Sequence, residues 1–317
     1  SDPPRNWSSR RMPTVAARFS LCGLIRRSRR SASPVLRALS SNASGNLCRG
    51  GLPRFHSPSL PTSKGNAVRI QGDEFWHMTK VLRLGPNDRV ELFDGKGGLV
   101  EGCIQSVSRT GLDIIALQEP QVVDPQGVQC HIYAAFGTLK GGRADWLVEK
   151  CTELGASSVT PLLTERSHTI TENRVERLER VVLAAVKQCQ RLHQMTLNPP
   201  MKFRKLLPMV SNSKFAFLAV AEATPLVNVL SESTVEDSGL LIVGPEGDFT
   251  NEEVKLLIEA GATAVGLGPC RLRVETATVA LLSTLMLWSD AQKLQFPLQW
   301  CDQVDPFAPC TKCLIRS

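Results

Sequence analysis

The chain has 317 residues, 37 of them basic and 30 acidic, and a formal net charge of +7. This excess lies in residues 1–63, which hold 11 arginines, no lysine and one acidic residue, Asp2. Without that segment the chain is slightly acidic, so its overall charge does not indicate a nucleic-acid-binding protein, and RNA contacts would require local patches. The ten cysteines have no regular spacing, which argues against a disulfide framework, and no apolar run is long enough to span a bilayer.

The first 63 residues are rich in arginine and serine and poor in acids, which is typical of an organelle transit peptide. We therefore predict a targeting segment over 1–63 and location in an organelle, either the chloroplast or the mitochondrion. A disordered RNA-binding arm is the alternative. At the other end, residues 294–317 are expected to form a C-terminal tail. Its Cys310 and Cys313 lack the two further ligands of a zinc site, so no metal is predicted.

Short apolar segments separated by turns predict a small β-barrel domain over residues 64–122. Its strands are expected at 89–93, 98–107 and 111–117. One helix is expected over 74–84, with an apolar stripe made of Phe75, Met78, Val81 and Leu82. A proline-containing linker over 119–127 leads into the next domain.

Strands and helices alternate from residue 128 to residue 293, which predicts an α/β domain with a mostly parallel sheet covered on both faces. Strands are expected at 130–136, 157–163, 215–221, 240–243 and 264–267. Helices are expected at 143–154, 172–193, 251–260 and 274–291.

Two of these strands end in glycine turns. The strand at 240–243 runs into Gly244, Pro245, Glu246 and Gly247, and the strand at 264–267 ends on Gly268. Between them, Thr250 and Glu253 have the spacing of a capping box, and Gly261 is expected to close the helix. In a parallel sheet, ligands sit beyond the carboxyl ends of the strands, so the sequence predicts a small-molecule pocket here.

Neither the dinucleotide fingerprint nor the phosphate-binding loop occurs in the chain. Pro245 removes one of the N–H donors that a phosphate would use, and Glu246 would repel a pyrophosphate. The turn therefore suits a ligand with amino and hydroxyl groups and little negative charge. A tight turn with a solvated glutamate is the alternative.

The segments GPEGDF and LGPCRLRVETA closely resemble the signature of the RsmE-type small-subunit ribosomal RNA uridine-N3 methyltransferases, whose pattern is GPEGGF and LGxRILRxETA. Residues 77–93, 140–167 and 186–191 also match, so the resemblance covers residues 68–288 in order. This family belongs to the SPOUT class. The resemblance implies a knotted, mostly parallel α/β sheet with an N-terminal PUA-like β-barrel domain, and S-adenosyl-L-methionine as the cofactor.

By resemblance, three loops at 218–222, 244–247 and 267–272, with the helix start that follows, form the cofactor pocket. The cofactor-binding residues implied are Leu218, Glu222, Gly244, Pro245, Glu246, Gly247, Leu267, Gly268, Leu272 and Thr276. Two positions depart from the pattern. Asp248 replaces the usual second glycine, and Cys270-Arg271 stands where the family commonly has arginine and then an aliphatic residue. If that arginine positions the substrate, Arg271 or Arg273 must serve instead.

Methylation at uridine N3 requires loss of the N3 proton, which is largely retained at neutral pH. An arginine beside the base would stabilise the developing negative charge. Arg273 is expected in this role, with Glu275 holding it in place. The alternative is an ordinary helix N-terminal salt bridge from Arg273 to Glu275 or Glu246.

RNA-binding residues are expected in both domains, for recognition of folded ribosomal RNA of the small ribosomal subunit by its shape. His77, Lys80 and Arg83 are spaced three apart on the predicted helix and are expected to share a face. That face would meet phosphates, or else be an ordinary solvated surface. Arg143 and Arg166 match family motif positions in the second domain.

The family also implies a homodimer formed through the catalytic domain. The helix expected at 274–291 is apolar nearly all round, so it fits either a core or an interface. An inactive ribosome-assembly factor that keeps the fold and the RNA affinity is the alternative function. The departures at Asp248 and Cys270 motivate it.

Overall fold

The structure, a computed structural model, describes residues 51–137, 139, 142–167, 172–234 and 236–294. The first 50 residues of the predicted leader and the tail beyond residue 294, with Cys310 and Cys313, lie outside the described residues. Within the described ranges, no helix combines the length and apolar character needed to cross a bilayer.

The N-terminal domain is built on a six-stranded sheet with the strand order β1-β3-β4-β5-β2, and β6 pairs with β4. β1 pairs with β3 in parallel and the other pairs are antiparallel. The strands are β1 (Arg54–His56), β2 (Ala67–Ile70), β3 (Arg89–Phe93), β4 (Gly98–Val107), β5 (Leu112–Ala116) and β6 (Gln121–Val122). The predicted strands of this domain are confirmed.

The predicted boundary at residue 64 is too late, because β1 lies before it. Phe55 of β1 is 3% exposed and packs in the core of this domain. The segment before residue 64 therefore contributes a strand, and a targeting segment has to end before Arg54. β1 was not predicted because its three residues are too short a run to stand out from the Arg-rich leader.

The helix of this domain changes geometry part-way. α1 (Gly72–Trp76) continues into η2 (His77–Val81), a π-helical turn in which the Leu82 N–H donates to the His77 carbonyl five residues back. Met78 is buried as expected, and Phe75 and Leu82 pack on the core. Val81 is 50% exposed, so its place in the apolar stripe was wrong. The wider turn rotates it away from the face that a regular helix would give it.

The second domain contains a seven-stranded sheet with the order β10-β8-β7-β12-β11-β13, and β9 beside β8. All of its described strand pairs are parallel. The strands are β7 (Gln129–Ala134), β8 (Ser158–Leu163), β9 (Thr196–Leu197), β10 (Met201–Lys202), β11 (Ala216–Ala219), β12 (Ser238–Val243) and β13 (Thr263–Val265). Each of the five predicted strands is confirmed, while the two-residue strands β9 and β10 were not predicted.

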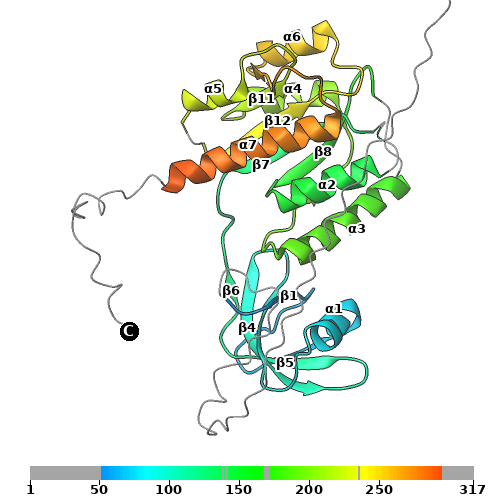
Figure 1. Cartoon of the computed structure of the whole chain (residues 1–317), viewed down its shortest axis with the longest axis vertical. Helices are drawn as coiled ribbons and strands as arrows, with labels where there is room; N and C mark the ends of the chain where they lie inside the picture. The colour runs from blue at the N-terminus through cyan, green and yellow to red at the C-terminus, as the bar shows by residue number, and fades with distance from the viewer. Residues whose placement is uncertain (1–50, 138, 140–141, 168–171, 235, 295–317) are drawn as a thin grey trace, which may run out of the picture. The chain divides into compact units, whose positions relative to one another are not determined.

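Helices cover both faces of this sheet (Figure 1). One face carries α2 (Arg143–Glu153), α3 (Glu172–Cys189), α5 (Leu226–Ser231) and α7 (Val274–Leu294). The other carries η3 (Phe203–Lys205), α4 (Leu207–Ser211) and α6 (Asn251–Glu259). Successive side chains of a strand point to opposite faces, so Leu241 and Val243 join the first core and Leu240 and Ile242 the second. The two-sided α/β prediction is confirmed.

The start of α6 fixes the end of the glycine turn after β12. Thr250 and Glu253 form the predicted capping box, in which each side chain accepts a backbone N–H of the other. The second carboxylate oxygen of Glu253 accepts the N–H of Glu165, 3.0 Å away, in the loop after β8. Glu253 is 3% exposed, so this one buried carboxylate joins two loops at the same edge of the sheet.

The chain path brings two more loops, those after β11 and β13, to that edge. β11 pairs with β12 on one side and with β13 on the other, all in parallel. The chain therefore leaves β12, forms α6, passes beyond β11 to β13, and then returns as α7 to pack against α2, β7 and β12 (Figure 1). The loops after β11, β12 and β13 consequently lie next to one another.

Candidate functional site

A cavity of about 290 Å³ lies at the carboxyl edge of the parallel sheet, where the sequence predicted a pocket. It is formed by the loops after β11, β12 and β13 together with the first turn of α7. Its lining consists of Ala219, Val220, Ala221, Val243, Gly244, Pro245, Asp248, Phe249, Asn251, Val254, Leu267, Gly268, Cys270, Arg271, Leu272, Val274 and Ala277. Most of these side chains are apolar, so the polar groups that the loops offer are largely backbone N–H and C=O groups.

The turn after β12 accommodates an aspartate where the family pattern has glycine. Asp248 has a φ of +58°, in the left-handed region that glycine adopts without strain and that aspartate tolerates better than most residues. Its N–H donates to the Pro245 carbonyl at 2.9 Å, which closes the turn. The ring of Phe249 packs on Gly244, where an added Cβ would lie 2.9 Å from the ring. Aspartate at position 248 therefore adds a side chain to the cavity and is compatible with the hydrogen-bonded turn.

Half of the residues implied as cofactor-binding line the cavity: Gly244, Pro245, Leu267, Gly268 and Leu272. Leu218 is instead buried in the core beneath α6, because strand alternation turns it to that face of β11. Glu222, Glu246, Gly247 and Thr276 are exposed outside the cavity. Counting alternate positions along β11 would have excluded Leu218. The places of Glu222, Glu246 and Gly247 depend on loop conformation, and Thr276 lies on α7.

Sequence reasoning placed the loop at 267–272 in the pocket without naming Cys270 or Arg271 as cofactor-binding, and it left out Asp248 and Phe249; all four line the cavity. The signal was present in part, because Asp248 and the Cys270-Arg271 pair are the two departures from the family pattern. Phe249 follows the turn directly and is 7% exposed. Its burial against Gly244 could not be read from spacing.

Three arginines converge on the turn at residues 244–248. Arg143, at the start of α2, lies 2.8 Å from the carboxylate of Glu246. Arg166, in the loop after β8, donates to the Gly247 carbonyl at 2.7 Å. Arg271 donates to the Glu246 carbonyl at 2.9 Å and lies 3.1 Å from the carboxylate of Asp248. Positive charge from three separate segments of the chain therefore surrounds this turn.

Glu275 does not hold Arg273, which corrects the expected pairing. Glu275 is 6% exposed, and its Oε1 lies 3.6 Å from Nη1 of Arg143. Its other oxygen, Oε2, is buried without a hydrogen-bond partner among the described residues. Arg273 is exposed and precedes Val274, the first residue of α7. Arg143 is therefore the cation beside both Glu275 and Glu246, the two residues to which an ion pair from Arg273 had been the alternative.

The expected RNA-binding groups do not form the predicted shared face. His77 is half-buried and packs edge-on against Phe55, with ring centroids 6.0 Å apart. Lys80 is exposed on η2, but Arg83 lies beyond it with a φ of +57° and so is off the helix. The guanidinium groups of Arg143 and Arg166 both contact the turn after β12.

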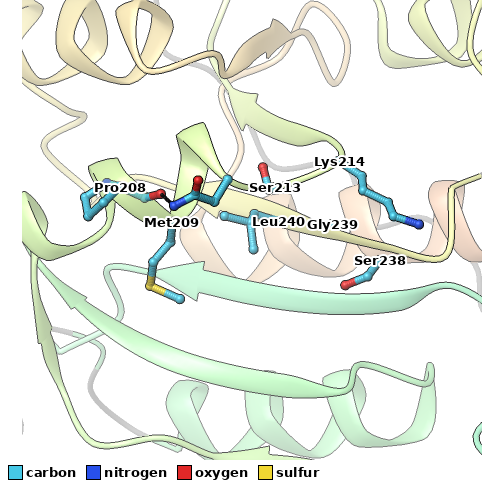
Figure 2. Close-up of a pocket in the computed structure, with 8 residues that line it drawn as sticks. Pro208, Met209, Ser213, Lys214, Ser238, Gly239 and Leu240 are labelled. Carbon is cyan, nitrogen blue, oxygen red and sulfur yellow. Dashed lines mark hydrogen bonds between the residues drawn. The ribbon is translucent and has the colours of Figure 1, made fainter.

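A second hollow, of about 480 Å³, lies at the opposite edge of the sheet, at the start of β12 (Figure 2). Figure 2 shows Pro208 and Met209 at one end and Lys214 at the other, with Leu240 between them. The Lys214 ammonium lies 3.3 Å from Asp237, and this pairing raises its pKa. Although larger, this hollow lies at the amino ends of the strands, away from the edge where parallel sheets bind ligands. In the described ranges, no three metal-ligating side chains gather.

Comparison with known proteins agrees with the site. The sequence matches the RNA methyltransferase domain family over residues 126–286 and the RNA methyltransferase PUA domain family over residues 70–117. It is 31% identical over 219 residues to ribosomal RNA small subunit methyltransferase E of Synechocystis, a match that covers 68% of this chain and 71% of that protein. The chain belongs to the ribosomal RNA small subunit methyltransferase E family. The resemblance seen in the GPEGDF and LGPCRLRVETA segments is thereby confirmed.

Other members of the methyltransferase E family extend the match. The Bacillus subtilis protein is 28% identical over 227 residues, covering 68% of this chain and 88% of its own length. The solved structure of the Neisseria gonorrhoeae enzyme bound to S-adenosyl methionine is 28% identical, with a TM-score of 0.63, covering 75% of this chain and 99% of that one. The SPOUT-type α/β fold with an N-terminal PUA-like domain is thus confirmed.

Proposed function

We propose that this chain transfers the methyl group of S-adenosyl-L-methionine to N3 of a uridine in small-subunit ribosomal RNA. The observation that carries the proposal is the cavity between the turn at 244–248 and the loop at 266–273, beside which Arg273 is exposed. Family membership supports the reaction class, and the Neisseria gonorrhoeae relative was solved with this cofactor.

The residues of the cavity fit that cofactor. Apolar side chains such as Val220, Leu267 and Leu272 offer surface to an adenosine, and the turns offer backbone groups to its polar edges. Gly268 has a φ of +112°, and the space where its Cβ would stand is open. When bound, S-adenosyl-L-methionine supplies an activated methyl group. No phosphate-binding loop is needed, because this cofactor has no phosphate.

The protein's own groups then act on the base. Arg273 extends from the start of α7 and is exposed, so its guanidinium is available to stabilise negative charge on the uracil as the N3 proton leaves. Glu275 and Arg143 position it indirectly, because their contact fixes the start of α7 against the start of α2. Arg273 is thus the proposed catalytic residue, and Glu275 a positioning residue.

RNA contact is assigned to both domains. The match to the RNA methyltransferase PUA domain supports a role for the N-terminal domain, where Lys80 and Arg83 are exposed cations. His77 is proposed to support this surface by packing against Phe55. The names of the relatives support the small ribosomal subunit as the source of the RNA.

The active form is proposed to be a homodimer formed through the second domain. α7 buries one face, with Leu281, Leu282 and Leu285 in the core, whereas Leu287 is 71% exposed. A single exposed apolar side chain is common on protein surfaces, so the proposal rests on the family resemblance, and Leu287 supplies the position at which to test it. Sedimentation of the protein and of Leu287→Arg tests this proposal. A wild-type monomer at micromolar concentration would contradict it.

The leader is proposed to direct the protein to a chloroplast or a mitochondrion. The support is its composition, with arginines and serines and one acid. Because β1 begins at Arg54, the targeting information should lie within residues 1–53. A fluorescent protein fused behind those residues should enter one organelle. Diffuse cytosolic fluorescence would contradict the proposal.

The transferase reaction is tested by incubating the protein with methyl-labelled S-adenosyl-L-methionine and purified small ribosomal subunits. Incorporation into the RNA is expected, and Arg273→Gln should reduce the rate by about a hundredfold while leaving cofactor affinity unchanged. Cofactor binding without incorporation into subunits or deproteinised RNA would contradict the proposal and support the assembly-factor alternative.

A further inference from the structure

Asp248 and Arg271 are the only charged side chains among the residues that line the cavity. They come from different loops, the turn after β12 and the loop after β13, and Nη2 of Arg271 lies 3.1 Å from Oδ2 of Asp248. They also occupy the two stretches in which the chain departs from the family pattern. One anion and one cation therefore stand together on an otherwise uncharged wall.

This ion pair can be opened at little cost. The side chains are 76% and 72% exposed, and exposed ion pairs contribute little because water solvates both partners. Arg271 also donates to the Glu246 carbonyl at 2.9 Å, so its guanidinium stays at the cavity when the pair opens. Two opposite charges are then available to a ligand of matching shape.

We propose that Asp248 and Arg271 bind the α-amino acid group of the methyl donor, with Arg271 taking its carboxylate and Asp248 its ammonium. This inference rests on the proposed function. An α-amino acid is a zwitterion with adjacent opposite charges, so it replaces one exposed ion pair by two charge-assisted contacts. A planar guanidinium is suited to bidentate binding of a carboxylate. The uncharged remainder of the lining is left for the adenosine.

The assignment is specific to these two side chains. Neither Glu246 nor Arg143, the nearest other pair, lines the cavity, and they contact each other outside it. Phe249 and Leu272 offer no charge. A ligand with a carboxylate and an ammonium group therefore has one place on this wall where both are neutralised.

The test compares four ligands by calorimetric titration of the full chain. S-adenosylhomocysteine and S-adenosyl-L-methionine carry both charged groups. Decarboxylated S-adenosylmethionine keeps only the ammonium, and 5′-methylthioadenosine has neither. Arg271→Gln should weaken the first two about tenfold or more and leave the other two within about twofold. Asp248→Asn, which keeps a residue suited to the left-handed conformation, should weaken every ligand except 5′-methylthioadenosine.

Lys255→Gln is the matched control, because Lys255 is an exposed cation paired with Glu259 on α6 and does not line the cavity. It should bind all four ligands as the wild type does. Melting temperatures establish that each variant is folded. Equal losses for all four ligands, or no loss for any, would overturn the inference. Failure of the wild type to bind any of the four would instead count against the proposed function itself.

Discussion

The guanidinium of Arg143 lies 3.6 Å from the buried carboxylate of Glu275, and so joins the start of α2 to the start of α7. The same Nη1 atom lies 2.8 Å from Glu246 in the turn after β12. One arginine thereby fixes two elements beside the cavity. This places Arg143 in the support of the site, whereas its motif position had suggested RNA binding.

Replacing Arg143 by alanine should destabilise the fold. Glu275 is 6% exposed, and loss of its nearest cation leaves a buried carboxylate with a desolvation cost of about 1–3 kcal/mol. Chemical denaturation should show a fall of that size in the free energy of unfolding. The double variant Arg143→Ala/Glu275→Gln should recover much of the loss, since no charge is then buried. A single variant as stable as the wild type would contradict this account.

Gly268 and Gly247 should respond differently to alanine. Gly268 lines the cavity and has a φ of +112°, so a side chain there costs about 1–3 kcal/mol of strain and alters the wall. Gly247 does not line the cavity, and its Cβ would make an ordinary contact 3.5 Å from Arg166. Calorimetry should show weaker cofactor binding for Gly268→Ala and near-normal binding for Gly247→Ala. The reverse order would contradict the assignment.

Cys270 should be the thiol that reports on the cavity. It is exposed and lines the cavity, whereas burial raises the pKa of Cys130 and of Cys151 to about 12 and keeps both as unreactive thiols. Brief alkylation followed by peptide mass spectrometry should label Cys270 and spare these two. Saturating S-adenosylhomocysteine should slow the labelling of Cys270. Labelling that is unaffected by ligand would place the ligand elsewhere.

Acid should destabilise the second domain through His131. Burial lowers the pKa of this histidine from its ordinary value of 6.5, and its Nδ1 lies 2.8 Å from Oγ of Ser158. Below pH 6.5 the unfolded chain takes up a proton that the folded state refuses, so stability falls with pH until the lowered folded pKa is reached. The slope for this group cannot exceed about 1.4 kcal/mol per pH unit. Denaturation between pH 7 and 5 should show a shallower decline for His131→Gln, and identical slopes would contradict this prediction.

Local signals in the sequence predicted the architecture well. The capping box of Thr250 and Glu253 placed the start of α6, and Gly261 follows its end. Apolar runs such as β12 and long helical segments such as α7 were also found. The shorter elements were not, because α4 and α5 span only 5 and 6 residues and show no clear period. β1 was missed for the same reason.

The site was predicted less completely, because it depends on contacts between distant segments. The partner of Glu275 is Arg143, more than a hundred residues earlier in the chain, and no local pattern encodes that choice. Similarly, Asp248 and Arg271 were recognised as departures, but their pairing emerges only once the loops after β12 and β13 meet.

The identity of the methylated nucleoside tests the central claim most directly. Small ribosomal subunits methylated by this protein would be digested to nucleosides and analysed by chromatography and mass spectrometry. The account predicts N3-methyluridine, formed by the wild type and strongly reduced for Arg273→Gln. A methylated cytidine or a 2′-O-methylated ribose as the product would contradict it.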